Sequence, residues 1–467
     1  MKTIKPIVLL LAVLCISVSN VYSQNWPMVG GCKERTSCAQ NCSNFNLPLT
    51  KEVVSSSWAD EMAYYEGVLY ISYAGANNEL HAIDAQTGNV LWTFVLQNSA
   101  GSVGVVPAVC DSVVLIGGQN AAGIYAICRV SGCPAWSKPI GAMYTRNPII
   151  DDEKVYVVTD SLYCLDLYDG ATIWSQTVYG QITPAVDENH VYVFGNGFLN
   201  AFDKNSGNIV WQTSASYYAF AGIAVDQYFV YTEKLTSVSA FDKTNGTPVW
   251  TYDLPSGELS GLNQGPLAIS ENIICLALWD NGQGNGQITA INRSDGAYLW
   301  HQEQGGEGTF TPLIANGMVF IVNWTEAKLY GFDLSAGNQV FSDDSESYEN
   351  QPIIGDEAMY VISADIIRFN PTAVGMEQNH NLASEAVMAS PNPCNSEISF
   401  IMDLDKSSMV GLGIYDLSGS TVYSENPAMH EAGPCRITCN TEKLVPGTYI
   451  YRILLNGKEF CGKFIRQ

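Results

Sequence analysis

A short turn motif recurs along the first three quarters of the chain and limits the possible folds more than any other feature. Its pattern is an acid or an amide, a glycine four positions later and an aromatic residue four positions after that. Six copies follow it: Asp84, Gly88 and Trp92; Asp166, Gly170 and Trp174; Asp203, Gly207 and Trp211; Asp242, Gly246 and Trp250; Asn292, Gly296 and Trp300; Asp333, Gly337 and Phe341. The chain therefore repeats one supersecondary unit.

Two further copies depart from the pattern. In one, Cys128 replaces the acid, while Gly132 and Trp136 keep their spacing. In the other, Asn370 closes a strand-like run, and neither the glycine nor the aromatic follows. The first positions of the eight copies are 37 to 50 residues apart, a spacing typical of four-stranded propeller blades.

The physical chemistry of the motif explains its spacing. A carboxylate at the end of a strand can accept turn N–H groups, and the glycine supplies the positive φ that a bulged hairpin needs. The aromatic ring then lies on the returning strand. We expect each ring to fill the gap between its own sheet and the next one, because large buried aromatics contribute strongly to a core.

A closed ring removes the exposed edges that a solenoid must cap. The last copy lacks an outer strand, and residues 50–55 near the N-terminus can supply it. Glycine numbers 41 and charged residues are only 15%, a balance that favours many hairpins over long helices. The sequence predicts an all-β, eight-bladed β-propeller. A seven-bladed ring is the alternative, with the last unit serving only as a clasp.

The N-terminus has the pattern of a secretory signal peptide, with Lys2 and Lys5 before an apolar run over residues 7–18. We expect cleavage between Ser23 and Gln24. The run is shorter than the roughly 20 residues of a membrane span, so none is expected in the mature chain. The net charge of −24 repels phosphate backbones, which excludes nucleic-acid binding.

The repeat, over residues 26–370, resembles the pyrroloquinoline-quinone (PQQ) type of propeller repeat, whose pattern is Ala-x-Asp-x-x-Thr-Gly-x-x-x-Trp. The segment Asn25-Trp26-Pro27-Met28 is similar to the opening segment of such propellers. The resemblance implies a propeller over residues 24–370. Its family includes quinoprotein dehydrogenases, the propeller lipoprotein of the outer-membrane barrel-assembly machinery, and secreted proteins without demonstrated chemistry.

The pattern of the last part of the chain predicts a linker over residues 371–389 and a small Ig-like β-sandwich over residues 390–467. Four short motifs resemble the C-terminal sorting domain of type IX secretion substrates: SPNP at 390–393, IYDLSG at 414–419, LVPGTY at 444–449 and GKFIR at 462–466. The resemblance implies that residues 390–467 bind the type IX machinery, and that the protein is secreted or displayed on the outer cell surface.

Motifs for chemistry are scarce. A quinone enzyme of this family would carry adjacent cysteines, a tryptophan floor under the cofactor, and Glu, Asn and Asp for calcium. The sequence has no adjacent cysteines, and six of its ten tryptophans occupy the repeat position. The remaining four identify no floor: Trp26, Trp58, Trp279 and Trp324. Hydrolase, zincin and nucleotide signatures are absent from the sequence.

Two candidate metal sites are weak. Residues 280–286 (DNGQGNG) offer oxygens as a calcium loop does, but lack the closing glutamate. Cys32, Cys38 and Cys42 lack the fourth ligand that zinc prefers.

The sequence therefore predicts no catalytic residue, no metal and no cofactor. We expect a non-catalytic, secreted or cell-surface propeller that binds a protein or a glycan through its loop face. One alternative is a PQQ-dependent quinoprotein dehydrogenase with calcium. The other is a carbohydrate-active enzyme on a propeller scaffold.

Removal of the signal peptide leaves 12 of the 13 cysteines, and disulfides are the default in an exported chain. Cys435 and Cys439 lie on one strand-like run, roughly 13 Å apart, which is too far for a disulfide. Cys394 and Cys461 should therefore each pair with one of them.

A second disulfide prediction concerns the degenerate turn. Cys128 and Cys133 flank one hairpin reversal, so a bond between them would hold the turn that Asp holds elsewhere. Two free thiols, or other partners such as Cys110 or Cys164, are the alternatives.

Overall fold

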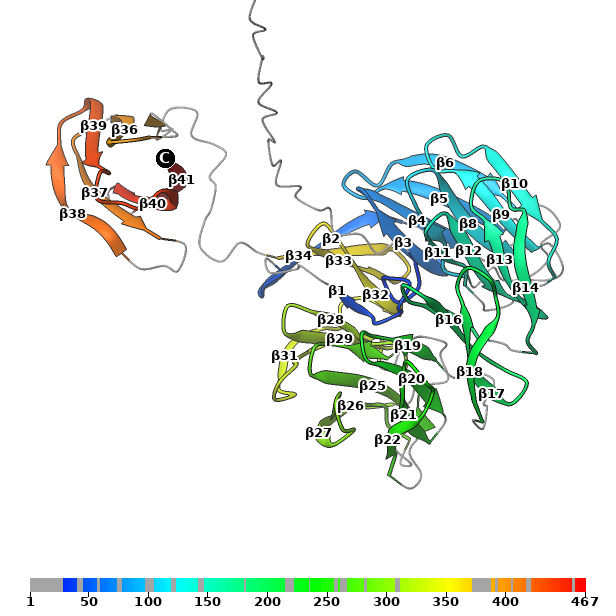
Figure 1. Cartoon of the computed structure of the whole chain (residues 1–467). Helices are drawn as coiled ribbons and strands as arrows, with labels where there is room; N and C mark the ends of the chain where they lie inside the picture. Colours follow the sequence, from blue (N-terminus) through cyan, green and yellow to red (C-terminus); the bar gives the residue numbers. More distant parts are fainter. Residues whose placement is uncertain are drawn as a thin grey trace, which may run out of the picture. The chain divides into compact units, whose positions relative to one another are not determined.

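The structure is a computed structural model of the whole chain. It describes residues 28–39, 45–56, 59–73, 78–96, 105–118, 123–141, 147–179, 182–214, 222–234, 236–255, 259–260, 267–280, 284–306, 311–371, 388–390, 394–404, 406–416, 421–455 and 458–467. The regular elements among these residues are all β-strands, and no helix there is long and apolar enough to cross a membrane. The chain divides into two compact units, Met1–Thr372 and Ala373–Gln467 (Figure 1).

The first unit is an all-β propeller built from antiparallel sheets, of which its described residues form eight. In the first five sheets, strands that follow one another in sequence lie side by side. The first sheet contains β3 (Glu61–Tyr65), β4 (Val68–Tyr73), β5 (Glu79–Asp84) and β6 (Val90–Val95). The second contains β7 (Ala108–Val109), β8 (Val113–Gly118), β9 (Gly123–Cys128) and β10 (Pro134–Lys138).

The next three sheets repeat this order. The third contains β11 (Ile149–Asp151), β12 (Lys154–Val158), β13 (Ser161–Asp166) and β14 (Thr172–Thr177). The fourth contains β15 (Ala185–Val186), β16 (His190–Gly195), β17 (Phe198–Asp203) and β18 (Ile209–Ser214). The fifth contains β19 (Ile223–Val225), β20 (Phe229–Lys234), β21 (Ser237–Asp242) and β22 (Pro248–Asp253).

The last three sheets include additional or borrowed strands. The sixth contains β23 (Leu259–Ser260), β24 (Ala268–Ile269), β25 (Ile273–Asp280), β26 (Gln287–Asn292) and β27 (Tyr298–Glu303). The seventh contains β28 (Leu313–Ala315), β29 (Met318–Asn323), β30 (Lys328–Asp333) and β31 (Gln339–Asp343), with β1 (Cys38–Ala39) added. The eighth contains β32 (Glu349–Gly355), β33 (Ala358–Ile362), β34 (Ile366–Pro371) and β2 (Leu49–Ser55).

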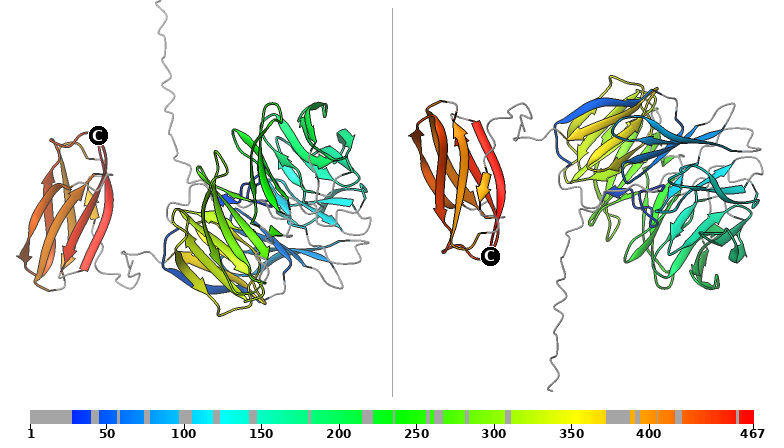
Figure 2. Two further views of the ribbon diagram at one scale, coloured as in Figure 1. Left: turned by 90° about the horizontal axis from the view of Figure 1, so that it is seen from below. Right: turned by 90° about the horizontal axis from the view of Figure 1, so that it is seen from above.

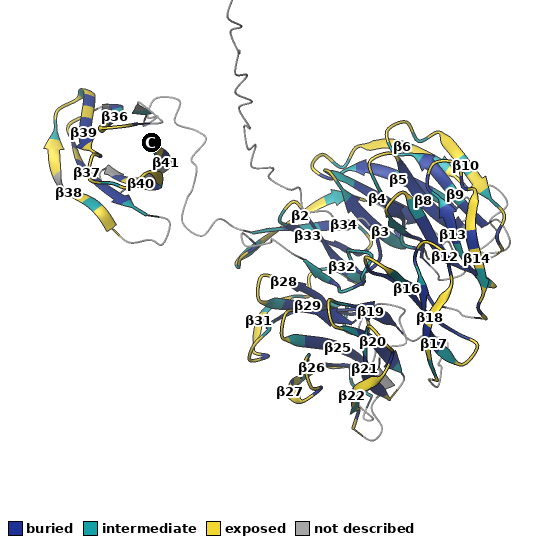
Figure 3. Cartoon of the chain, in the orientation of Figure 1, coloured by how far each residue is buried: buried dark blue, intermediate teal, exposed yellow. Residues whose placement is uncertain are grey.

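Burial follows the position of a strand within its sheet. The second strand is almost wholly buried, as in β12, because both of its faces meet neighbouring sheets. The outermost strand is largely exposed, and in β14, β18, β22 and β27 the single buried position is the repeat tryptophan. Figure 3 shows these outer strands mostly in yellow, around the dark blue strands inside them.

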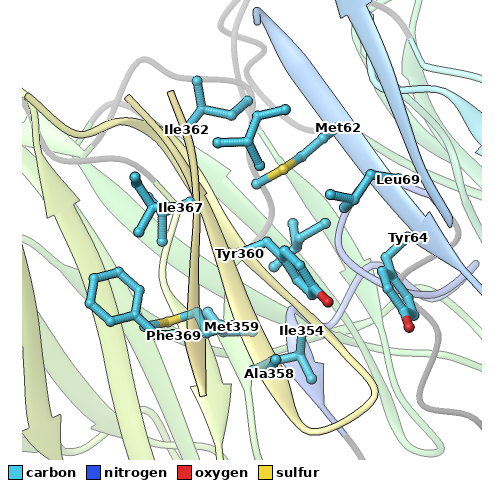
Figure 4. Close-up of a cluster of buried hydrophobic side chains, with 14 of the residues drawn as sticks. Met62, Tyr64, Leu69, Ile354, Ala358, Met359, Tyr360, Ile362, Ile367 and Phe369 are labelled. Atoms are coloured by element: carbon cyan, nitrogen blue, oxygen red, sulfur yellow. The ribbon is translucent and has the colours of Figure 1, made fainter. Parts of the chain in front are cut away.

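The two ends of the first unit meet in the eighth sheet. Strand β2 pairs antiparallel with β34, from Leu49 opposite Pro371 to Ser55 opposite Ile366. This is the outer strand that the sequence predicted for the last copy. The first and eighth sheets also share a core, in which the rings of Tyr64 and Tyr360 stack at 5.4 Å (Figure 4).

The second unit consists of two antiparallel sheets around one core. One sheet contains β35 (Met388–Ser390), β36 (Glu397–Leu404) and β39 (Gly433–Asn440). The other contains β37 (Ser408–Tyr415), β38 (Thr421–His430), β40 (Gly447–Leu455) and β41 (Lys458–Arg466). The predicted signal peptide and most of the predicted linker lie outside the described residues.

Candidate functional site

The repeated turns place the predicted residues in one recurring geometry. The Asp84 carboxylate accepts the Thr87 N–H at 2.7 Å and the Thr87 hydroxyl at 2.8 Å, and Gly88 has φ +72°. These hydrogen bonds hold the pKa of Asp84 below its usual range. The side-chain oxygen at this position also accepts turn N–H groups in the other regular copies: Asp166, Asp203, Asp242, Asn292 and Asp333.

At the degenerate turn, sulfur takes the place of the carboxylate. The hydroxyl of Ser131 and the backbone N–H groups of Ser131 and Val130 hydrogen-bond the Cys128 sulfur and lower its pKa. The Cys128 N–H donates to the Cys133 carbonyl at 2.8 Å, and the two residues are separate thiols in this structure. The disulfide between them stays a prediction.

Each repeat tryptophan bridges two sheets. Its indole N–H donates to the backbone carbonyl that directly follows the turn acid, or its substitute, in the next sheet. The pairs are Trp92 with Arg129 at 2.8 Å, Trp136 with Leu167 at 2.9 Å, Trp174 with Lys204 at 3.1 Å, Trp211 with Lys243 at 2.9 Å, Trp250 with Arg293 at 3.1 Å and Trp300 with Leu334 at 3.0 Å. Phe341 has no such donor and instead contacts Phe369, with ring centroids 5.7 Å apart.

The turn glycine of the next sheet packs closely against each of these tryptophan rings, without room for a side chain. A Cβ added to Gly246 would stand 2.3 Å from Cε3 of Trp211. A Cβ would stand 2.5–2.7 Å from the preceding ring at the other turn glycines: Gly132, Gly170, Gly207, Gly296 and Gly337. The spacing of the motif therefore sets the distance between sheets as well as the turn.

A second set of inter-sheet contacts was not predicted. Where a cation directly follows the turn acid or its substitute, its side chain reaches back to an acid of a preceding sheet. These pairs are Arg129 with Glu66 at 3.2 Å, Lys204 with Asp151 at 2.6 Å, Lys243 with Asp187 at 3.2 Å and Arg293 with Asp226 at 2.9 Å. The recurrence of a cation at this position was a signal that the sequence offered.

The N-terminal residues 33–39, which we call the axial segment, contact the innermost strands of successive sheets. Backbone carbonyls of the segment accept N–H groups from β15, β19, β24 and β28 in turn. The pairs are Lys33 with Val186 at 2.9 Å, Glu34 with Val225 at 2.9 Å, Thr36 with Ile269 at 2.7 Å and Ser37 with Ile314 at 2.9 Å. Because innermost strands converge on the axis of a propeller, this segment lies at the axis; Figure 2 shows the dark blue ribbon among the sheets.

Side chains of the axial segment extend these contacts to further sheets. Lys33 donates to Asp151 of the third sheet at 2.8 Å, and Gln351 of the eighth donates to the Ser37 hydroxyl at 3.3 Å. Arg35 is fully buried and donates to the Thr183 carbonyl at 2.7 Å. Burial lowers the pKa of Arg35 to about 10, opposed by the charge of Glu233. Backbone hydrogen bonds and charged side chains thus both bind the axial segment to the sheets.

A tryptophan floor for PQQ can be sought only among the seven tryptophans whose side chains the structure describes. Six tryptophans are used between sheets, and Trp324 is 44% exposed after β29. No group of three His, Cys, Asp or Glu side chains suited to a metal ion occurs in the described ranges. The axis holds Arg35 and the backbone around it. Residues 281–283 of the loop and Cys42 of the cysteine cluster lie outside the described residues.

The predicted binding face falls largely outside the described residues as well. Several connections between one sheet and the next belong to the undescribed ranges, namely 97–104, 142–146, 215–221, 261–266 and 307–310. The described residues therefore comprise the turn face and the axis of the propeller.

Comparison with known proteins gives matches for both units. Residues 47–157, 145–227 and 234–370 match the family described as outer membrane protein assembly factor BamB, and residues 389–467 match the secretion system C-terminal sorting domain. BamB of Yersinia pestis is 22% identical over 260 residues, which are 52% of this chain and 56% of that protein. The matched region thus spans little more than half of this curated relative.

Solved structures show the same fold at low identity. BamB from Moraxella catarrhalis has a TM-score of 0.56 and 17% identity, covering 69% of this chain and 100% of that one. Quinohemoprotein alcohol dehydrogenase from Comamonas testosteroni has a TM-score of 0.58 and 12% identity, covering 78% and 82%. The family match covers well over half of the chain, so the protein belongs to the BamB family of PQQ-type propellers and ends in a type IX sorting domain.

Proposed function

We propose that this protein is a non-catalytic binding or scaffold propeller, which type IX secretion delivers to the cell surface or the medium, and which binds a protein or a glycan through its loop face. The sorting domain supports the export. The axial segment supports a binding role without catalysis, and it is the observation that carries the proposal.

The axis is where side chains from every sheet of a propeller approach one another, so it is the natural place for an enclosed small-molecule site. In this protein, the N–H groups of Val186, Val225, Ile269 and Ile314 bind the chain's own carbonyls there. A cofactor at that level would have to displace these bonds and the buried Arg35. The surface that remains for a ligand is the set of loops, which a rigid scaffold displays.

The family match also supports a binding role without catalysis. The related proteins are described as assembly factors for outer membrane proteins, a role named for assembly and not for a reaction. With a net charge of −24, the present chain favours a ligand surface that is basic or neutral.

Cofactor titration separates this proposal from a quinoprotein dehydrogenase. Purified exported protein is mixed with PQQ and Ca²⁺, and absorbance and dye reduction with alcohols or sugars are recorded. We expect neither a spectral shift nor turnover. Stoichiometric uptake of PQQ with substrate-dependent dye reduction would overturn the proposal.

A glycan array with product analysis separates binding from a carbohydrate-active enzyme. We expect any retained glycan to be recovered intact. The appearance of shortened glycans, absent with heat-denatured protein, would assign catalysis instead.

A further inference from the structure

We propose that Cys38 of the axial segment and Cys275 of β25 form a disulfide bond in the exported protein, which fixes the axial segment covalently to the sixth sheet. Neither residue belongs to the disulfide pairs that the sequence suggested. The proposal rests on strand pairing and on shared burial.

Backbone contacts on both sides place Cys38 between the sixth and seventh sheets. Two residues earlier, the Thr36 carbonyl accepts the Ile269 N–H of β24 at 2.7 Å. Cys38 itself pairs with Ile314 of β28 in a parallel bridge. Strand β24 in turn pairs with β25, with Ala268 opposite Cys275. Only one strand therefore separates the axial segment from Cys275.

The side chains meet in one cluster. Cys275 is fully buried in the core between the sixth and seventh sheets, together with Ala268 and Ile314, and Cys38 packs against that same core. Burial raises the pKa of the Cys275 thiol, and the charge of Cys38 raises it further, which is the effect of a neighbouring sulfur. In the folded chain, the contacts with β24 and β28 keep Cys38 beside the core that contains Cys275.

Bond formation requires an oxidant, and export supplies the compartment for it. Each thiol loses one proton and one electron as the S–S bond forms, and a protein disulfide of a periplasmic thiol oxidase takes up the two electrons and two protons to become a dithiol. Because Cys275 is fully buried in the closed ring, the bond forms before the axial segment is enclosed. This step rests on the export part of the proposed function.

Digestion without reduction tests the bond directly. Trypsin leaves Cys275 on the peptide 244–293 and leaves both Cys38 and Cys42 on the peptide 36–51. We expect mass spectrometry of the exported protein to show these two peptides linked. The link should persist in Cys42→Ser and disappear in Cys38→Ser, since Cys42 shares the peptide but not the bond.

Stability measurements give a second readout. Reduction should lower the melting temperature of the wild-type propeller by about 5 °C, because the bond closes a very long loop. The part of this response that depends on the bond should be lost equally in Cys38→Ala, in Cys275→Ala and in the double variant. Cys164→Ala is the matched control, a buried cysteine of β13 in the third sheet, and should keep it.

The outcomes are distinguishable. A bond from Cys38 to Cys32 or Cys42, or alkylation of both Cys38 and Cys275 in denatured, unreduced exported protein, would overturn the proposal. Refolding in oxidised and reduced glutathione tests the same link without export. If the refolded chain contains the link but cells do not export the protein, the export proposal fails and the disulfide stands.

Discussion

The ammonium group of Lys204 lies 2.6 Å from the carboxylate of Asp151, although these side chains are only 4% and 9% exposed. The ammonium group of Lys33, in the axial segment, also lies 2.8 Å from the carboxylate of Asp151. One buried carboxylate therefore joins the third sheet, the fourth sheet and the N-terminus, and each partner offsets the cost of burying the others.

The first prediction concerns this network. Lys204→Met should lower the free energy of unfolding by about 3 kcal/mol, because Asp151 then keeps only one of its two cations in a buried place. Urea denaturation of both proteins measures the change. Asp152→Asn is the control, since Asp152 also contacts Lys204 but is 69% exposed, and it should cost less than about 0.5 kcal/mol. Equal losses in the two variants would contradict the buried network.

The second prediction separates backbone strain from inter-sheet contact. Gly197 and Gly246 have φ of +83° and +72°, but a Cβ meets nothing within 4 Å at Gly197 and meets the Trp211 ring at Gly246. Gly197→Ala should therefore cost about 1 kcal/mol, the strain of the left-handed region alone. Gly246→Ala should cost roughly 3 kcal/mol, because the ring must move. Thermal denaturation compares them, and similar melting temperatures would exclude the docking role of Trp211.

The third prediction concerns pH. Burial, and then the charge of Asp60, raise the pKa of Glu61 on β3 to about 8. A carboxyl whose pKa is raised by folding contributes stability that is complete below its unfolded pKa and is lost as pH rises through the folded one. The melting temperature should thus fall between pH 5 and pH 8.

Glu61→Gln tests the origin of that fall, since the amide does not titrate. The variant should show a flatter profile over this pH window. Asp84→Asn serves as the control, because the pKa of Asp84 is lowered and its effect belongs to acid pH. A Glu61→Gln profile as steep as that of the wild type would assign the dependence to other groups.

The fourth prediction concerns the cysteines of the second unit. Cys435 and Cys439 both lie on β39, and burial, followed by the charges of Glu425 and Cys394, raises the pKa of Cys439 to about 11. We therefore expect Cys394, as the nearby sulfur, to bond Cys439, which leaves Cys435 for Cys461. Mass mapping of the unreduced unit checks the pairing, and a bond from Cys394 to Cys461 would refute it.

The fifth prediction concerns export. Deletion of residues 391–467 should leave the propeller folded but retained in the periplasm. The reason is that the second unit is a separate compact body and carries the match to the sorting domain. Fractionation of cells locates the protein, and tryptophan fluorescence reports its fold. Recovery of the truncated protein in the medium, at the level of the full chain, would show that the sorting domain is not required.

The sequence predicted the parts of this fold that depend on local spacing. Asp, Gly and Trp at fixed intervals define one turn and one contact to the next sheet, so the all-β propeller could be predicted from them. The closing strand β2 could also be predicted, because the last copy lacks a partner. The turn at Cys128 keeps the same spacing with a sulfur as hydrogen-bond acceptor, and the covalent cap there stays a prediction.

The axial segment could not be predicted in this way. Its bonds reach strands more than a hundred residues away and use mainly backbone carbonyls, which leave no periodic pattern. The consecutive charges Lys33, Glu34 and Arg35 are a signal, since only 15% of the chain is charged. Their interpretation needs the ring, because only the folded sheets show that Arg35 is buried among them.

The placement of residues 33–39 and 49–55 has a consequence for the order of assembly. Residues 33–39 lie at the axis, and residues 49–55 lie beside β34, whose last residue is Pro371. A growing chain therefore cannot complete the ring until Pro371 has been synthesised, as judged by that register. Until then, both ends of the array stay open. A chain with this arrangement can close its propeller only where residues 33–55 and β34 are present in the same compartment.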